Sequence, residues 1–121
     1  MGLDMYAYKT KENIPPVDFK EPETSAEIFY WRKHPDLHGW MENLYIEKGG
    51  ENPDFNLVPV RLDAEDLDAL EKDIALQMLP QTSGFFFGES RPEDTLDDKR
   101  FIETARQALR EGYTIFYSSW W

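Results

Sequence analysis

The sequence contains no cysteine and only two histidines among its 121 residues. The lack of cysteine excludes disulfides, thiolate zinc sites and cysteine nucleophiles, and it fits a reducing compartment. No apolar run approaches the roughly 20 residues that a membrane span needs. The N-terminal MGLDMYAY also lacks the basic and apolar regions of a signal peptide. We therefore expect a cytoplasmic protein that does not enter a membrane.

Positive charge is also scarce, since 24 acidic residues outnumber 13 basic ones and give a net charge of −11. Such a charge repels phosphate backbones and anionic lipids, so direct binding of nucleic acid is not expected. It favours solubility, or docking on a basic protein partner. Hydrophobic residues still make up 40% of the chain and aromatic residues 15%. This length and composition predict one domain, residues 1–121, with a packed core.

The spacing of apolar residues predicts an α+β fold with a mixed or antiparallel sheet of about five short strands covered by three helices. The stretches expected to form strands are 3–8, 27–31, 56–62, 84–88 (GFFFG) and 113–121. The stretches expected to form helices are 35–48, 64–79 and 95–111. Three prolines and many charges make residues 9–27 an irregular excursion between the first two strands.

Local patterns mark the ends of these elements. Asp63 is expected to cap the second helix, with Leu62 and Leu67 packing around the cap, and the apolar stripe continues to Met78. Thr95 is expected to cap the third helix. Pro59 places the 56–62 strand at an edge of the sheet, because proline cannot donate to a central strand.

The two histidines stand four residues apart in YWRKHPDLHGW, residues 30–40, a spacing that holds zinc when both lie on one helix. Pro35 follows His34, and the residue before proline is disfavoured in helical conformation. We therefore expect no metal site and no bound cofactor. His34 is interpreted as a surface residue beside a helix start, and His38 as a residue at the boundary of the core.

A carboxylate within an aromatic strand is costly unless it is paired or exposed, and Asp4 is such a residue. Arg32 is its expected partner, in a structural ion pair. The alternative is a ligand-binding or catalytic cluster that adds Tyr6 and His38. Its aromatic lining would be Trp31 and Trp40.

The chain ends in YSSWW, and Trp120 and Trp121 would point to opposite faces of a continuing strand. Tryptophan is common at binding hot spots, so these two residues are the predicted partner surface. The alternative is that one fills the core while the other packs beneath the excursion. The acidic run 63–73 is interpreted as a solvated helix face.

Several blocks of the sequence together resemble a family of short bacterial and phage proteins. The blocks are MGLDMY, YWRK followed by His38 and Trp40, LPQTSGFFFG, and the aromatic C-terminal strand. They occur in the same order across nearly the whole chain. The resemblance implies a shared domain of phage or mobile-element origin and brings no established activity. The IPPVDFKEPETS part of the excursion departs from it and has the character of an insertion.

No complete catalytic constellation is recognisable, so no residue is assigned as catalytic. The leading hypothesis is a non-enzymatic interaction or regulatory protein that docks on a basic partner. The alternative is a small enzyme or ligand-binding protein that uses Asp4, Tyr6, Arg32 and His38. A weaker hypothesis is mimicry of nucleic acid by the carboxylates of 63–73 and 93–98. The sequence leaves homo-oligomerisation open.

Overall fold

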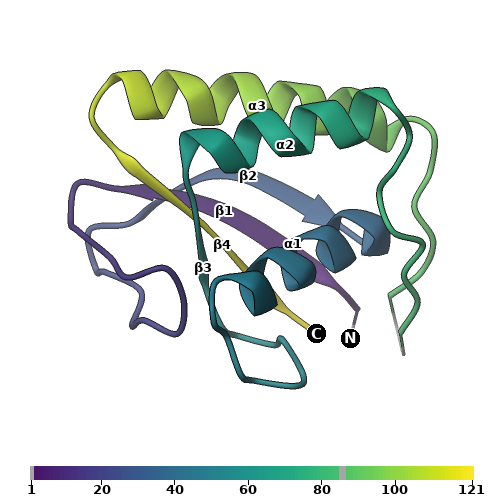
Figure 1. The fold of residues 1–121 in the computed structure, drawn as a ribbon, viewed down its shortest axis with the longest axis horizontal. Helices are drawn as coiled ribbons and strands as arrows, with labels where there is room; N and C mark the ends of the chain where they lie inside the picture. The colour runs from purple at the N-terminus through teal and green to yellow at the C-terminus, as the bar shows by residue number, and fades with distance from the viewer. Residues whose placement is uncertain (1, 85–86) are drawn as a thin grey trace.

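The computed structural model describes residues 2–84 and 87–121. These residues form seven helices and strands, whose arrangement Figure 1 shows. Their order is β1 (Asp4–Thr10), β2 (Ala26–Arg32), α1 (Pro35–Glu47), β3 (Val60–Leu62), α2 (Ala64–Ala75), α3 (Asp94–Arg110) and β4 (Thr114–Trp120). The predicted α+β class is confirmed.

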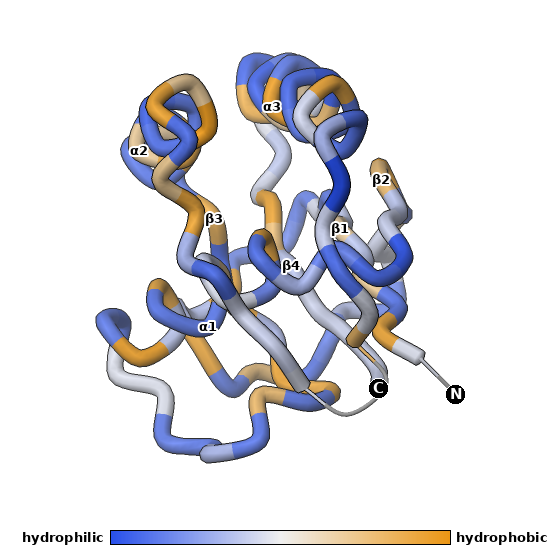
Figure 2. Tube along the Cα trace, turned by 90° about the vertical axis from the view of Figure 1, so that its right-hand side faces the viewer, coloured by the Kyte–Doolittle hydropathy of each residue, from blue (hydrophilic) through white to orange (hydrophobic). Residues whose placement is uncertain are grey.

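The sheet is antiparallel with the strand order β2-β1-β4-β3, so four strands are present in the described part of the chain. The central strands β1 and β4 come from opposite ends of the sequence and pair over seven positions, from Asp4 opposite Trp120 to Thr10 opposite Thr114. The pairing brings the two chain ends to the same end of the sheet, where Figures 1 and 2 show them. β3 is an edge strand, as predicted, but it begins at Val60 rather than at residue 56, so Pro59 precedes it.

One face of the sheet is packed against the helices. Met5 and Ala7 of β1 lie in register with Ser119 and Tyr117 of β4, and these side chains point into the core. Figure 1 shows α2 and α3 side by side above the sheet, with α1 lower in front of the strands. Figure 2 shows both hydrophobic and hydrophilic residues on α2 and α3, as expected for helices that cover a core. The helix residues buried there are Leu37, Met41, Leu44, Tyr45, Leu67, Leu70, Ile74, Phe101, Ile102 and Ala105.

The predicted start of α2 is confirmed, because the backbone N–H of Asp63 donates to the Asp66 carboxylate at 2.7 Å. Its predicted end is wrong. The helix stops at Ala75, and Gln77 has a left-handed φ of 55°, which leaves Met78 outside the helix and exposed. The predicted cap of α3 also shifts, since the helix begins at Asp94 rather than after Thr95.

The strand predicted at 84–88 falls partly on residues 85 and 86, which lie outside the described residues. Phe87 is described, and it is buried without belonging to a strand. Its ring packs edge-on against Trp121, at a centroid distance of 5.0 Å. The described part of GFFFG therefore contributes a core side chain from a loop.

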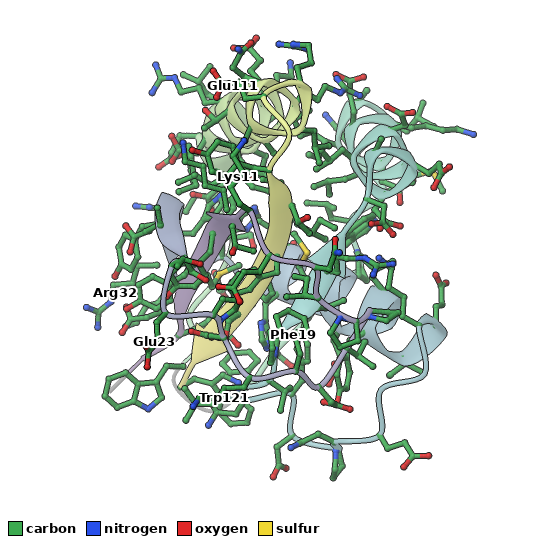
Figure 3. The ribbon with its side chains drawn as sticks, turned by 90° about the vertical axis from the view of Figure 1, so that its left-hand side faces the viewer. Lys11, Phe19, Glu23, Arg32, Glu111 and Trp121 are labelled. Carbon is green, nitrogen blue, oxygen red and sulfur yellow. The ribbon has the colours of Figure 1, made fainter. Side chains whose placement is uncertain are left out.

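The excursion is shorter than predicted, residues 11–25, because β1 continues to Thr10 and β2 begins at Ala26. Its proline-rich half runs beside β3, where Val17 forms an isolated bridge with Val60 and the Arg61 N–H donates to the Pro16 carbonyl at 2.9 Å. The Tyr45 hydroxyl donates to the Asp18 carboxylate at 2.6 Å. Figure 3 shows the excursion crossing in front of the sheet, with Phe19 directed onto it.

Replacement of Tyr45 by phenylalanine should loosen this attachment. The variant loses the bond to Asp18 and also the bond in which the Asn52 N–H donates to the Tyr45 hydroxyl. We expect the free energy of unfolding to fall by about 1–2 kcal/mol in urea titrations at neutral pH. The matched control is Tyr113→Phe, because the hydroxyl of Tyr113 takes part in none of the hydrogen bonds among the described residues. An equal loss in both variants would contradict the assignment.

Candidate functional site

The structure does not assemble the cluster predicted from Asp4, Tyr6, Arg32 and His38. Asp4 and Tyr6 alternate with the buried Met5, so they occupy the sheet face that points away from the helices, here called the outer face. Arg32 is the register partner of Asp4 and shares that face, as Figure 3 shows at the sheet edge. His38 is buried on the helix side. The sheet therefore separates His38 from Asp4, and the two cannot act as one acid–base pair.

The aromatic residues predicted to line that cluster are also divided. Trp31 pairs with Met5 in register and is buried in the core. Trp40 lies on α1, half-buried, and its indole N–H donates to the Asp73 carboxylate at 2.8 Å. Neither lines the outer face, so their predicted binding role gains no support from the geometry.

A continuous row of aromatic rings crosses the outer face. Ring centroids are 5.2 Å apart for Phe19 and Phe116, 5.0 Å for Phe116 and Tyr8, 6.0 Å for Tyr8 and Tyr6, and 5.3 Å for Tyr6 and Tyr30. The excursion covers one end, where Phe116 is fully buried. At the other end Tyr30 is 44% exposed. Tyr6, Tyr8 and Tyr30 are called the tyrosine patch below.

Carboxylates surround the tyrosine patch. The Tyr30 hydroxyl donates to Asp4 Oδ1 at 2.6 Å, and this bond is the main reason that the pKa of Tyr30 is raised to about 12. Burial raises the pKa of Tyr8 to about 12, with further contributions from Glu21 and Glu27. Burial, Asp4 and Glu27 raise the pKa of Tyr6. Arg32, on the same face, acts on the pKa of Tyr30 in the opposite direction. The patch is therefore aromatic, with more carboxylates than cations among the groups that act on its tyrosines.

The two C-terminal tryptophans are used differently. Trp120 lies opposite Asp4 on the outer face and is 61% exposed. Trp121 is half-buried, with its indole N–H donating to the Phe55 carbonyl at 3.2 Å and its ring against Phe87. The geometry supports Trp120 as part of a contact surface, whereas Trp121 closes the end of the core.

His38 is a satisfied core residue. Its Nδ1 lies 2.7 Å from the Tyr117 hydroxyl, and its ring packs against Phe55 and Phe87. Burial lowers the pKa of His38 to about 4. The imidazole is neutral at physiological pH and has no carboxylate partner among the described residues.

The interpretation of His34 as a surface residue is wrong. Pro35 does begin α1, so His34 stands outside the helix as predicted. Lys33, however, takes a left-handed φ of 54°, and its N–H donates to the Leu3 carbonyl at 2.8 Å. This conformation turns the chain after β2 toward the core. His34 follows this turn and is only 3% exposed.

His34 lies in a hydrogen-bonded cluster that joins three segments of the chain. Its Nδ1 is 2.6 Å from Ser90 Oγ, and its Nε2 is 2.9 Å from Asp98 Oδ2. The other oxygen of Asp98 accepts the indole N–H of Trp31 at 3.2 Å. Asp94 approaches Nδ1 at 3.7 Å. His34, Ser90, Asp94 and Asp98 are called the His34 cluster.

The His34 cluster borders a cleft of about 550 Å³ between the start of α1, the end of α2 and the start of α3. Ile74 and Leu79 supply apolar wall, and Arg91 and Gln77 supply polar groups. Ser90 also borders a second cleft of about 490 Å³ with Thr82. Ser90 is therefore the member of the cluster that both clefts reach.

Sequence periodicity could have found part of these sites. Tyr8 follows Asp4 and Tyr6 at intervals of two, so one strand face contains all three. The His34 cluster left no comparable pattern, because His34 and Asp98 are 64 positions apart. Among the described residues, no three or more His, Cys, Asp or Glu side chains are arranged so that they could hold a metal ion.

Comparison with known proteins identifies no relative: no family model matches, and no curated protein or solved structure is significantly similar to the chain. The resemblance to short bacterial and phage proteins stays a prediction. No helix in the described part of the chain is long and apolar enough to cross a bilayer.

The buried His38 should make stability depend on pH. Above about pH 6.5 the imidazole is neutral in both states, and between pH 6.5 and 4 only the unfolded chain takes up a proton. Stability should therefore fall as the pH falls through this range, with His38 contributing about 3 kcal/mol. Urea titrations at pH 7 and pH 4 should show a smaller fall in His38→Gln than in wild type. Identical pH dependence would contradict the assignment.

Proposed function

We propose that this chain is an acidic interaction protein that binds an extended basic segment of a partner protein on its outer face. The observation that carries the proposal is the tyrosine patch, in which Tyr30 is 44% exposed and Tyr6 and Tyr8 are partly exposed, with Asp4 and Glu27 beside it. Guanidinium and ammonium groups bind both to carboxylates and to the faces of aromatic rings, so this surface suits arginine and lysine.

The overall charge supports the same occupant. A net charge of −11 attracts a basic segment at long range and repels a second copy of the chain. Trp120 extends the patch across β4 and gives it the kind of large exposed aromatic that dominates binding energies. A homodimer through this face would bring like charges together, which makes it the less favourable alternative.

Mimicry of nucleic acid is less well supported, because internal partners hold most of the helical carboxylates. Arg106 of α3 binds Asp68 and Glu71 at 2.7 and 2.8 Å. Lys48 binds Asp66, and Trp40 binds Asp73. The run 63–73 is thus a set of helix-to-helix attachments rather than a row of free charges spaced like phosphates.

The proposal includes a regulatory role, which follows from the net charge and the tryptophans, and a phage or mobile-element origin, which follows from the sequence resemblance alone. A cytoplasmic location belongs to it through the lack of cysteine. Neither affects the test, which asks only whether the outer face recognises basic chain segments.

The test is a calorimetric titration of the protein with an oligo-arginine peptide at two salt concentrations. Tyr30→Ala and Trp120→Ala should each weaken binding about tenfold, because each removes an exposed ring from the contact. The control is Leu76→Ala, which removes an exposed apolar side chain beyond the end of α2. Affinity should fall as salt rises.

Three results would overturn this proposal. The first is no binding at low salt. The second is equal weakening by Leu76→Ala, which would mean attraction by net charge without a defined surface. The third is a dimer in light scattering that Trp120→Ala dissociates, since the outer face would then be the contact between two copies.

A further inference from the structure

We infer that the His34 cluster is a nucleophilic site in which Ser90 attacks small uncharged carboxylic esters. This activity is separate from the proposed docking of a basic segment, which uses the outer face. It departs from the sequence-based expectation that no residue is catalytic. The inference rests on the order of the three groups, Ser90 to His34 to Asp98, at hydrogen-bond distances of 2.6 and 2.9 Å.

The hydrogen bonds of the cluster assign its protons. Asp98 accepts the Trp31 indole N–H on one oxygen, so its other oxygen is free to accept the Nε2–H of His34. That tautomer leaves Nδ1 as an acceptor for the Ser90 hydroxyl. The Asp36 backbone N–H donates to Ser90 Oγ at 3.0 Å and orients the hydroxyl toward Nδ1. Every member then has a partner consistent with general-base activation of serine.

In many serine hydrolases Nδ1 of the histidine faces the carboxylate and Nε2 faces the serine. In this cluster Nε2 faces Asp98 and Nδ1 faces Ser90. The reversal keeps the path of the proton, because either nitrogen of imidazole can accept it while the other donates. Asp94, 3.7 Å from Nδ1, adds a second negative charge beside the imidazolium that forms during the reaction. That ion is further stabilised by Asp98.

The surroundings define the substrate class. Ser90 is half-buried and borders the cleft of about 550 Å³, so a small molecule can reach it. Ile74 and Leu79 offer an apolar wall for an acyl group. Three carboxylates border this cleft, those of Asp36, Asp94 and Asp98. They outnumber its cation Arg91, which lies 3.8 Å from Asp94, and this balance disfavours anionic substrates. A short, uncharged ester fits these requirements.

The reaction balances in two steps. Ser90 Oγ attacks the carbonyl carbon while its proton passes to His34 Nδ1; the carbon–oxygen bond to the alcohol then breaks, and the alcohol leaves with that proton. Water next attacks the acyl carbon and gives a proton to Nδ1. The bond to Oγ breaks, Oγ regains the proton, and the carboxylic acid departs.

The first experiment uses the wild-type chain with a fluorophosphonate probe, in which Oγ displaces fluoride from phosphorus. Peptide mapping should locate one adduct, on Ser90, and labelling should disappear in urea because it depends on the folded cluster. Ser90→Ala should abolish labelling, whereas Ser83→Ala, an exposed serine of the preceding loop, should leave it unchanged. Hydrolysis of p-nitrophenyl acetate should follow the same pattern.

His34→Gln separates a catalytic role from a structural one, since glutamine can still donate to Asp98 but cannot act as the base. Its labelling rate should fall by about 10²–10⁴-fold while its circular dichroism stays native. Asp98→Asn, which keeps an acceptor for Trp31, should also lower the rate. Absence of a Ser90 adduct on folded wild type would overturn the inference, as would an unchanged rate in a folded His34→Gln.

Discussion

The buried carboxylate of Asp98 joins α3 to the end of β2 and to the start of α1. It accepts one bond from Trp31 in β2 and one from His34 just after that strand, and it belongs to α3. A carboxylate so fully removed from water is costly unless both oxygens are bonded, and here both are. Through His34 the contact extends to Ser90, so the edge of the sheet, the start of α1 and the loop before α3 meet in one hydrogen-bonded cluster.

The two faces of the sheet differ in their surroundings. Its helix side is an ordinary core in which polar groups such as His38 and Tyr117 satisfy each other. Its outer side is only partly covered, so aromatic rings that alternate with core residues remain within reach of solvent at the β2 end. The alternation of β1 is thus the origin of both the core and the tyrosine patch.

The sequence predicted what short-range patterns encode. The α+β class, the start of α2 at Asp63 and the edge position of β3 follow from periodicity, capping and proline geometry. The end of α2 was missed because its apolar spacing continues to Met78 although the backbone reverses at Gln77. For the sites, steric reasoning placed His34 outside the helix but could not see that the turn at Lys33 directs it inward. Asp98, its partner, is 64 positions away, and only the folded chain brings them together.

The contact between the excursion and β3 has a consequence for the behaviour of the molecule at high concentration. An unpaired strand edge is a template on which another chain can add, and sheets guard such edges with prolines, bulges or covering loops. Pro16 and Val17 lie along the free edge of β3 and bond to its backbone groups. The excursion therefore covers the β3 edge of the sheet and hinders other chains from pairing with it and aggregating.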